Sequence, residues 1–384
     1  MQKILFVSSK DLSESLFDGA QKRSLGIVKS LSKKNKVDFA CISNKLVNNK
    51  NLNFCNKIFV FKINFFRRII NTIIYFLKLQ PMQNGYFHSK EMLNFIEENK
   101  DEYQVIIFHL VRCAQYLPGG YGGKTILEVT DLSSVNYEQV VKHLSAFNPI
   151  KYLYLVEKIL LTWYEKKVLD LFDRIVLVSK NEIPKLLQII RKDKVFIIGN
   201  SFEIKKKVFV HNSNNNKIFF VGNINYLPNK VACYNFVKSI LPKINIIYPE
   251  IEFNIIGKIN PIDKFFLNRK NVVIHGPIKK LDKIFKKSIC GVCNLDIATG
   301  LQNKIFTYMS YGLPAIISEE CFPDNLLKKN KDVLVYKNKK QFLNHIFKLI
   351  KSKSFSNKLS KNGFLAIKKK FKPSNTFDKY TNII

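Results

Sequence analysis

The chain has 384 residues, 46% of them hydrophobic, and a formal net charge of +34 at pH 7. This length accommodates two ordinary domains, and this hydrophobic content is typical of a globular protein. No uncharged apolar stretch reaches the roughly 18 residues that a transmembrane helix needs, so we expect none.

Short apolar runs alternate with helical patterns through the first half of the chain. The first run, "KILFVSS", becomes polar too soon for a signal peptide and predicts a buried strand. Helical patterns such as residues 19–34 and 91–100 separate the runs. Continuously apolar strands are typical of sheets covered on both faces, so this alternation predicts a doubly wound parallel sheet. The expected strands lie in residues 3–9, 36–43, 57–63, 105–111, 125–131, 174–180 and 194–200.

At about Phe202 the alternation is interrupted by the polar, Asn-rich stretch "SFEIKKKVFVHNSNNNK", which predicts a linker. It then resumes, and the tail after Lys337 has the pattern of two or three basic helices. We therefore expect an α/β fold with two domains in tandem and a cleft between them. The strands expected in the second half lie in residues 217–225, 252–259, 271–278, 289–295, 314–318 and 332–337.

Two helical stretches of the first half are unusually apolar. Residues 65–81 combine apolar bulk with Arg67, Arg68 and Lys78. This stretch is too short and too charged to span a bilayer, but it could lie on one. The alternative is a helix that faces the core of the first domain. Residues 150–172 predict a long helix of that domain.

The positive charge has three interpretations. Lys, Asn, Ile and Phe are all heavily used, as an AT-rich genome would produce, and the lysines are scattered along the chain. Attraction to an anionic membrane surface is the second interpretation. Nucleic-acid binding is the third, but no recognisable nucleic-acid motif supports it, so we expect no nucleic-acid partner.

Seven thinly spread cysteines predict a reducing compartment. Cys290 and Cys293 have the spacing of a metal or redox pair. No second pair or histidine pair is near, and positions three apart on a strand face opposite ways. We therefore expect neither role.

Ligands of open parallel sheets bind beyond the carboxyl ends of the strands, so the loops that follow the strands hold the candidate residues. After the first strand come Asp18 and Gly19, where a helix start offers amides to an anion. His109 and Arg112 follow a later strand, and the histidine there is either structural or catalytic. Asp131 follows the next strand and could act as a base, orient a hydroxyl or cap a helix.

The second domain offers two loops of the same kind. Gly222 and Asn223 end its first strand, where the backbone could approach a phosphate. Later, "TGLQNKIFTYMSYGLPAIIS" reads as loop, helix, turn and strand. Gly300 allows close approach, the amides near Gln302 and Asn303 start the helix, and Lys304 adds a positive charge.

Over nearly its whole length the chain resembles the GT-B glycosyltransferases, and within them the retaining family 4 of group 1 glycosyl transferases. The stretches that carry the resemblance are "DGAQKRSLGIVKSLSKKNKVDFACIS", "YEKKVLDLFDRIVLVSKNEIPKLL" with "VFIIGNSFE", "FFVGNINYLPNKVACYNFVKSILPKI" and "GLQNKIFTYMSYGLPAIIS". The resemblance is closest to an exopolysaccharide-type branch, through Val111, Arg112, Tyr116 and Leu117 and through "TDL" at 130–132.

This resemblance implies two tandem Rossmann-like domains facing a cleft, residues 1–205 and 206–372, with a segment 373–384 that returns to the first domain. It implies that Gly222, Asn223, Gly300, Gln302, Asn303, Lys304 and Thr307 bind the nucleotide-sugar donor. Asp18, Gly19 and Arg112 would bind the acceptor, and Asp131 and His109 would be catalytic. No metal or other cofactor is implied.

The chain departs from the family at two positions. Relatives commonly carry two acidic residues eight apart around the diphosphate-binding helix, one for the sugar and one for the ribose. Thr299 and Thr307 stand at those positions here. Each lost charge-assisted hydrogen bond costs about 1.5–3 kcal/mol, so donor binding is expected to be weaker unless neighbouring groups compensate.

The resemblance therefore predicts an enzyme that retains anomeric configuration and transfers a sugar to a glycan or lipid-linked acceptor in surface polysaccharide assembly. It would work in the cytoplasm, either free or as a peripheral protein at the inner face of the membrane. A catalytically weakened relative that acts as a binding or partner subunit is the alternative.

Overall fold

The computed structural model describes residues 1–12, 19–44, 52–178, 183–186, 190–202, 204, 209–278, 280–296, 298, 301–324, 326–370 and 376–384. Contacts divide the chain into two compact units, Met1–Ser201 with Ser374–Ile384, and Phe202–Pro373. The expected domain boundary was 205/206, so the division falls a few residues earlier.

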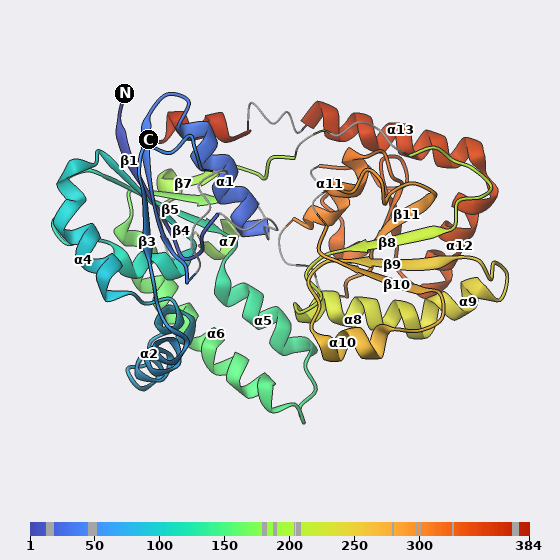
Figure 1. Cartoon of the computed structure of the whole chain (residues 1–384), viewed down its shortest axis with the longest axis horizontal. Coiled ribbons are helices and arrows are strands. Elements are labelled where there is room, and N and C mark those ends of the chain that lie inside the picture. Colours follow the sequence, from blue (N-terminus) through green and yellow to red (C-terminus); the bar gives the residue numbers. More distant parts are fainter. Residues whose placement is uncertain are drawn as a thin grey trace. The chain divides into compact units, whose positions relative to one another are not determined.

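The first unit is built on a seven-stranded parallel sheet in the order β3-β2-β1-β4-β5-β6-β7 (Figure 1). All seven expected strands are present. The strands are β1 (Lys3–Ser8), β2 (Lys36–Ile42), β3 (Ile58–Phe61), β4 (Val105–His109), β5 (Lys124–Thr130), β6 (Arg174–Leu177) and β7 (Val195–Ile197). The α-helices are α1 (Gly19–Leu31), α2 (Phe65–Leu77), α3 (Met82–Tyr86), α4 (Lys90–Asn99), α5 (Ser133–His143), α6 (Pro149–Val168) and α7 (Ile183–Leu186).

Both faces of this sheet are covered. Along β1, Leu5 and Val7 belong to one buried cluster, whereas Ile4 and Phe6 belong to another. Successive side chains of a strand point to opposite faces, so an uninterrupted apolar strand needs apolar cover on both sides. This is the physical reason why the short apolar runs predicted the sheet.

The C-terminal segment completes one of these two clusters. Its η9 (Phe377–Asn382) packs against α1, and Phe377, Tyr380 and Ile383 are buried there. The chain thus ends in the unit where it began.

The second unit has a six-stranded parallel sheet in the order β10-β9-β8-β11-β12-β13, with helices on both of its faces (Figure 1). All six strands expected in the second half are present. They are β8 (Lys217–Val221), β9 (Glu252–Ile256), β10 (Val272–Gly276), β11 (Ser288–Cys293), β12 (Ala315–Ser318) and β13 (Leu334–Tyr336). The helices are α8 (Leu227–Asn235), η7 (Phe236–Ile240), α9 (Leu241–Asn245), α10 (Pro261–Leu267), α11 (Asn303–Ser310), α12 (Lys339–Lys351) and α13 (Lys353–Lys370).

Short 3-10 segments join several of these elements. They are η2 (Lys100–Glu102), η3 (Val111–Tyr116), η4 (Leu169–Leu171), η6 (Lys192–Lys194) and η8 (Glu319–Cys321).

Each sheet has one point where the strand order reverses. In the first unit it lies between β1 and β4, and in the second between β8 and β11. Loops diverge to opposite faces at such a point, which leaves room for a ligand beyond the carboxyl ends of the strands. Across the described residues, no helix combines the length and apolarity needed to cross a membrane.

Candidate functional site

In the second unit, a buried tyrosine joins α11 to the carboxyl ends of the two strands at the switch point. The Tyr308 hydroxyl accepts a hydrogen bond from the Val221 amide at 2.8 Å and donates one to the Val292 carbonyl at 3.1 Å. Val221 is the last residue of β8, and Val292 lies near the end of β11. Helix α11 is therefore held against the strands at the switch point.

Lys304 links the start of α11 to the loop after β8. Its Nζ donates to Oδ1 of Asn229 at 2.6 Å and lies 4.6 Å from the centre of the Phe220 ring. Asn229 in turn donates to the carbonyl of Asn223 at 2.9 Å. The structure thus brings Lys304 and Asn223 together through a residue that the sequence analysis had not selected.

The environment of Lys304 is short of negative charge. The residue is only 8% exposed, and no carboxylate pairs with it among the residues described. A buried lysine normally needs a counter-ion because desolvation disfavours an isolated charge. An anionic ligand at this loop would supply that counter-ion.

Gly222 lies where two strand ends come very close. Its amide donates to the Ile256 carbonyl at 2.9 Å. Gly257, which follows β9, has φ +149°, and a Cβ on it would lie 1.6 Å from the Gly222 carbonyl oxygen. Only glycine fits at Gly257, because both its positive φ and this close approach exclude a side chain.

The rest of the predicted donor loop is only partly described. Thr299 and Gly300 lie outside the described residues. Gln302 is the N-cap of α11, and Asn303 is its first residue. Thr307 is half-buried, and its hydroxyl donates to the Asn303 carbonyl one turn back at 3.0 Å. The hydroxyl is thus used within the helix.

In the first unit, Asp131 lies just beyond β5 on a tight turn. Thr130 before it has φ +67°, a left-handed conformation that costs a non-glycine residue roughly 1–2 kcal/mol, and the Asp131 amide donates to the Val129 carbonyl at 2.9 Å. Such strain is concentrated at functional sites. The N-cap of α5 is Leu132, with no side-chain cap, so the side chain of Asp131 does not cap that helix.

The carboxyl group of Asp131 is in an environment that disfavours its charge. Burial raises its pKa from 3.8 to about 6; the Arg23 guanidinium opposes this shift, and the Glu128 carboxylate adds to it. Its Oδ1 is buried and accepts no hydrogen bond from any described residue. A buried acceptor without a partner is uncommon in a folded protein and calls for an explanation.

A buried ion pair lies beside Asp131. Arg23 of α1 donates to both oxygens of Glu128 in β5, at 2.8 and 3.0 Å. The same guanidinium donates to the carbonyls of Ile198 and Gly199, and the Tyr380 hydroxyl donates to Glu128. We call Arg23, Glu128, Ile198, Gly199 and Tyr380 the Arg23 cluster. It joins α1, β5, the end of β7 and the C-terminal segment.

Of the other predicted residues of the first unit, His109 and Arg112 lie near the β1–β4 switch point. His109 is almost fully buried, and its Nδ1 lies 3.0 Å from the Ser24 hydroxyl, so we propose that it positions α1 rather than touches substrate. Arg112 donates to the Ser9 hydroxyl at 2.9 Å. Gly19 is the exposed first residue of α1, and Asp18 lies outside the described residues.

The sequence analysis missed Arg23, Glu128, Asn229 and Gly257. Glu128 had a recognisable signal, because a carboxylate within the apolar run "TILEV" needs a buried partner. Arg23 and Asn229 had no such signal, because their importance comes from hydrogen bonds to residues that are distant in sequence, Glu128 and Lys304.

Both members of the CxxC pair are buried in β11. Cys293 lies 3.3 Å from the sulfur of Cys321, not against Cys290. Within the described ranges, no group of three His, Cys, Asp or Glu side chains could hold a metal ion.

Comparison with known proteins gives one family. Residues 215–352 match the family model described as glycosyl transferases group 1. No curated protein sequence gives a significant match.

Solved structures similar to this chain span both units. Sucrose-phosphate synthase from Thermosynechococcus elongatus is 14% identical with a TM-score of 0.72, covering 100% of this chain and 98% of its own. A mutant of S. aureus TarM, solved with fondaparinux, alpha-GlcNAc-glycerol and UDP, is 10% identical with a TM-score of 0.69, covering 100% and 99%. Anabaena HepE in complex with UDP-glucose is 11% identical with a TM-score of 0.67, covering 100% and 99%.

At these identities the structural likeness establishes the fold alone, and the match to a family model lies within the second unit. Residues 215–352 are similar to the glycosyl transferases group 1 family, and the two Rossmann-like sheets have the GT-B fold of the similar glycosyltransferase structures.

Proposed function

We propose that this glycosyltransferase retains anomeric configuration, needs no metal, and transfers a sugar from a nucleotide-sugar to a glycan or lipid-linked acceptor in surface polysaccharide biosynthesis. The observation that carries the donor half is Lys304, a buried cation held beside the Gly222 loop at the start of α11. The diphosphate of a nucleotide-sugar matches its charge, and the helix N-terminus adds to the attraction. TarM and HepE, each solved with UDP or a UDP-sugar, support this donor class.

The acceptor half of the proposal rests on the first unit. We propose that the Asp131 carboxylate accepts a hydrogen bond from a sugar hydroxyl, because its Oδ1 is buried without a partner among the described residues. Arg112, Gly19 and Asp18 would form the surroundings of the acceptor. The sugar, the base and the acceptor are set by side chains that differ among proteins of one fold.

The charge of Lys304 is the first test. Lys304→Met should weaken binding of the cognate nucleoside diphosphate by about 10- to 100-fold, since one charge-assisted hydrogen bond is lost. Because a buried, unpaired charge costs stability, the variant should unfold at a denaturant concentration no lower than the parent protein. Calorimetric titration with UDP, GDP and ADP, and denaturation of both proteins, measure the two effects.

Lys230→Met is the matched control. Lys230 is next to Asn229 in the chain, but its Nζ pairs with Asp263 at 2.7 Å. Its removal should leave nucleotide affinity unchanged. Failure of UDP, GDP and ADP alike to bind the parent protein would refute the donor site.

Thr307 is the observation that favours the alternative function, a weakened or inactive relative acting as a partner subunit. Its hydroxyl is bonded within α11 at the position where relatives commonly hold the ribose with a carboxylate. Release of free sugar from a nucleotide-sugar without acceptor distinguishes the two. Hydrolysis supports an enzyme, whereas binding with no hydrolysis and no transfer supports the partner subunit.

Restoring the carboxylate tests the ribose role directly. Thr307→Glu should tighten binding of the cognate nucleoside diphosphate by up to about ten-fold, because a carboxylate accepts two ribose hydrogen bonds. Pyrophosphate lacks the ribose and should bind equally to both proteins. Titration of a well-folded variant decides the matter, and unchanged or weaker nucleotide affinity would exclude this role.

A further inference from the structure

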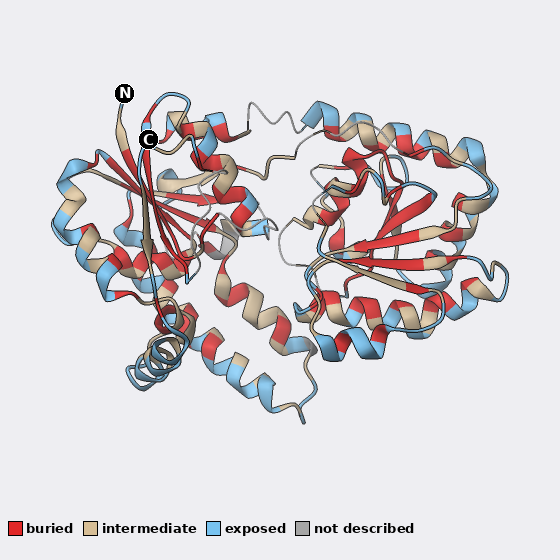
Figure 2. Ribbon diagram, viewed as in Figure 1, coloured by how far each residue is buried: buried red, intermediate tan, exposed pale blue. Residues whose placement is uncertain are grey.

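Helix α2 has its apolar side facing outward. None of its residues is buried, and Phe66 is 78% exposed. Figure 2 shows the helix largely in the colour of exposed residues. The outward stripe consists of Phe65, Phe66, Ile69, Ile70, Ile73, Ile74, Phe76 and Leu77. A helix on the surface of a globular protein normally has the opposite arrangement.

The side of α2 that faces the protein is polar. Arg68 donates to the carbonyls of Ile63 and Tyr86, and Asn71 donates to that of His88. The Tyr75 hydroxyl lies 2.9 Å from Nδ1 of His88 and donates to Gln115 at 3.0 Å. These bonds determine which side of the helix faces outward.

Close backbone packing also holds α2 in this orientation. It lies against α3, where a Cβ on Gly85 would be 2.4 Å from the carbonyl oxygen of Asn71. The N-terminus of α3 is in turn held by Glu157 of α6, which accepts from the amides of Met82 and Gln83 at 2.8 and 3.1 Å. The apolar stripe therefore cannot be buried by rotation of α2, and it stands out as a ridge about 20 Å long.

The sequence around this ridge carries only positive charge. No Asp or Glu occurs between Asp38 and Glu91. Lys62, Arg67 and Lys78, all exposed, flank the stripe at its two ends. A second copy of the chain would bring this basic segment against itself, which like-charge repulsion opposes, whereas an anionic surface complements it.

We propose that α2 docks on an anionic lipid bilayer, with its apolar stripe at the acyl boundary and its basic ends at lipid headgroups. A bilayer receives a convex apolar ridge without needing a preformed groove, and helices with one apolar face bind membranes in this way. Each Lys or Arg close to an anionic surface adds about 1 kcal/mol of attraction.

The docked helix is connected to the proposed acceptor residues. Gln115, which accepts from Tyr75 of α2, donates to the carbonyl of Arg112 at 2.9 Å. Docking would thus orient η3 relative to the membrane. The link between docking and the acceptor rests on the proposed function, because it assumes a lipid-linked acceptor. The docking of α2 on a bilayer does not depend on that function.

Vesicle binding tests the proposal on the full chain. The protein should bind phosphatidylcholine vesicles that contain phosphatidylglycerol, less so as salt rises, and bind pure phosphatidylcholine weakly. The double variant Ile70→Glu/Ile73→Glu should lower the partition coefficient at least about 100-fold, since two apolar side chains lose their burial. Nucleoside diphosphate affinity should not change, which separates this test from that of the donor site.

The control variant carries the same substitutions elsewhere. Ile246 and Ile247 at the end of α9 are 82% and 55% exposed, compared with 55% and 54% for Ile70 and Ile73. Ile246→Glu/Ile247→Glu changes the net charge equally and should bind vesicles like the parent. If both variants lost vesicle binding equally, the added negative charge alone would explain the loss, and the proposal would be overturned. Vesicle binding that is unchanged by the α2 variant would overturn it as well.

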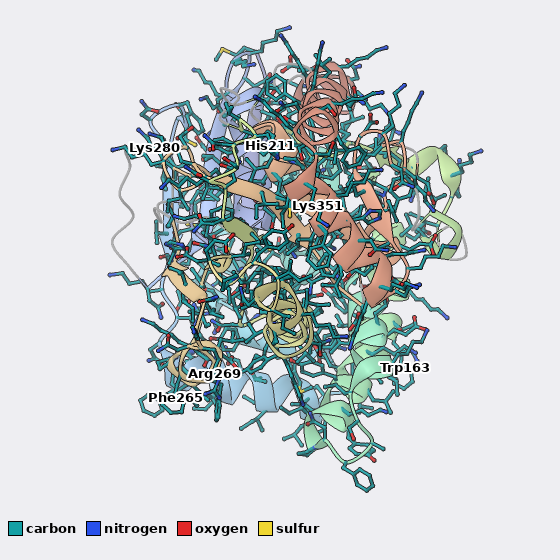
Figure 3. All side chains as sticks on the ribbon, turned by 90° about the vertical axis from the view of Figure 1, so that its right-hand side faces the viewer. Trp163, His211, Phe265, Arg269, Lys280 and Lys351 are labelled. Atoms are coloured by element: carbon teal, nitrogen blue, oxygen red, sulfur yellow. The ribbon has the colours of Figure 1, made fainter. Side chains whose placement is uncertain are left out.

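A tryptophan placed on the ridge reports insertion. Trp163, the single tryptophan of the chain, is exposed on α6 (Figure 3) and is replaced first. In the double variant Trp163→Phe/Phe66→Trp, vesicles should shift emission to shorter wavelength, and bromine-labelled acyl chains should quench it. If the protein binds vesicles but the emission of the introduced tryptophan does not shift, the membrane contact lies outside the α2 ridge and the proposal is wrong. The protein could instead fail to bind vesicles and sediment as a dimer that Ile70→Glu/Ile73→Glu abolishes. That outcome would assign the ridge to contact with a second copy of the chain.

Discussion

Asp131→Asn is expected to lower turnover by about 10²–10⁴-fold, the usual contribution of a group that exchanges a proton or holds a reacting hydroxyl. The amide is nearly the same size as the carboxyl group but cannot accept the proton or carry the charge. Nucleoside diphosphate affinity should stay unchanged, because Lys304 and the Gly222 loop belong to the other unit. Initial rates with the cognate donor, measured beside calorimetric affinity, test both statements.

The pH dependence of the parent protein follows from the same carboxyl group. Its pKa is raised to about 6, so the carboxylate form predominates only above that pH. If the carboxylate binds the sugar hydroxyl, turnover should rise as pH increases through about 6 and then level off. The low-pH limb should disappear from the residual rate of Asp131→Asn.

Stability provides the control for this variant. The folded-state pKa of Asp131 lies above its ordinary value of 3.8, so the folded state binds the proton more tightly. Its contribution to stability is therefore present below about pH 4 and is lost as pH rises towards 6. Asparagine does not ionise, so Asp131→Asn avoids the cost of a buried charge. The variant should therefore have a melting temperature no lower than that of the parent at neutral pH. A folded Asp131→Asn variant with normal turnover would contradict the proposed role. Asp101 is exposed, so the control variant Asp101→Asn should change neither the turnover nor the melting temperature.

Arg23→Met is expected to destabilise the first unit by about 3–5 kcal/mol, because it leaves the carboxylate of Glu128 buried without its counter-ion. The arginine is 2% exposed, and its guanidinium makes hydrogen bonds to Glu128, Ile198, Gly199 and Asn200. Methionine fills similar space but replaces none of these bonds. Chemical denaturation followed by circular dichroism gives the free energy of unfolding.

The partner residue supplies the matched rescue. Arg23→Met/Glu128→Gln should recover part of the loss, since no uncompensated charge remains, and the difference from the single variants gives the coupling energy. Burial already raises the pKa of Glu128, and removal of Arg23 raises it further. Arg23→Met should therefore gain stability as pH falls from 7 towards 5, relative to the double variant. Equal stability of both variants at every pH would show that the ion pair matters little.

The first-unit sheet shows why periodicity predicted the fold well. In β1 and β4 every side chain but the first of β1 is buried, so apolar residues occur without alternation, and no other common element produces short runs of this kind. The ends of helices were less well predicted. The pattern 19–34 continued to Lys34, whereas α1 ends at Leu31, because Lys33 and Lys34 fit a helix pattern as well as they fit a turn.

The candidate site was predictable only where chain order alone brings residues together. Strands of a parallel sheet all end at one edge, so Gly222, Asp131 and His109 could be placed at strand ends from their sequence positions. Which hydrogen bonds a side chain there makes depends on the elements packed against it. Nδ1 of His109 lies 3.0 Å from the Ser24 hydroxyl of α1, whereas Oδ1 of Asp131 accepts no hydrogen bond from a described residue, and both have the same sequence signal.

Three features of this protein were decided by tertiary structure. The Arg23 cluster joins residues from four distant segments, so no local pattern contains it. Lys304 became a strong candidate because the fold buries it beside Asn229 without a carboxylate among the described residues. The amphipathic pattern of residues 65–77 was visible in the sequence, but a pattern of period 3.6 states only that a helix has two different sides. Which side faces outward was decided by the hydrogen bonds of Arg68, Asn71 and Tyr75 to the protein, since polar groups that leave water must find partners.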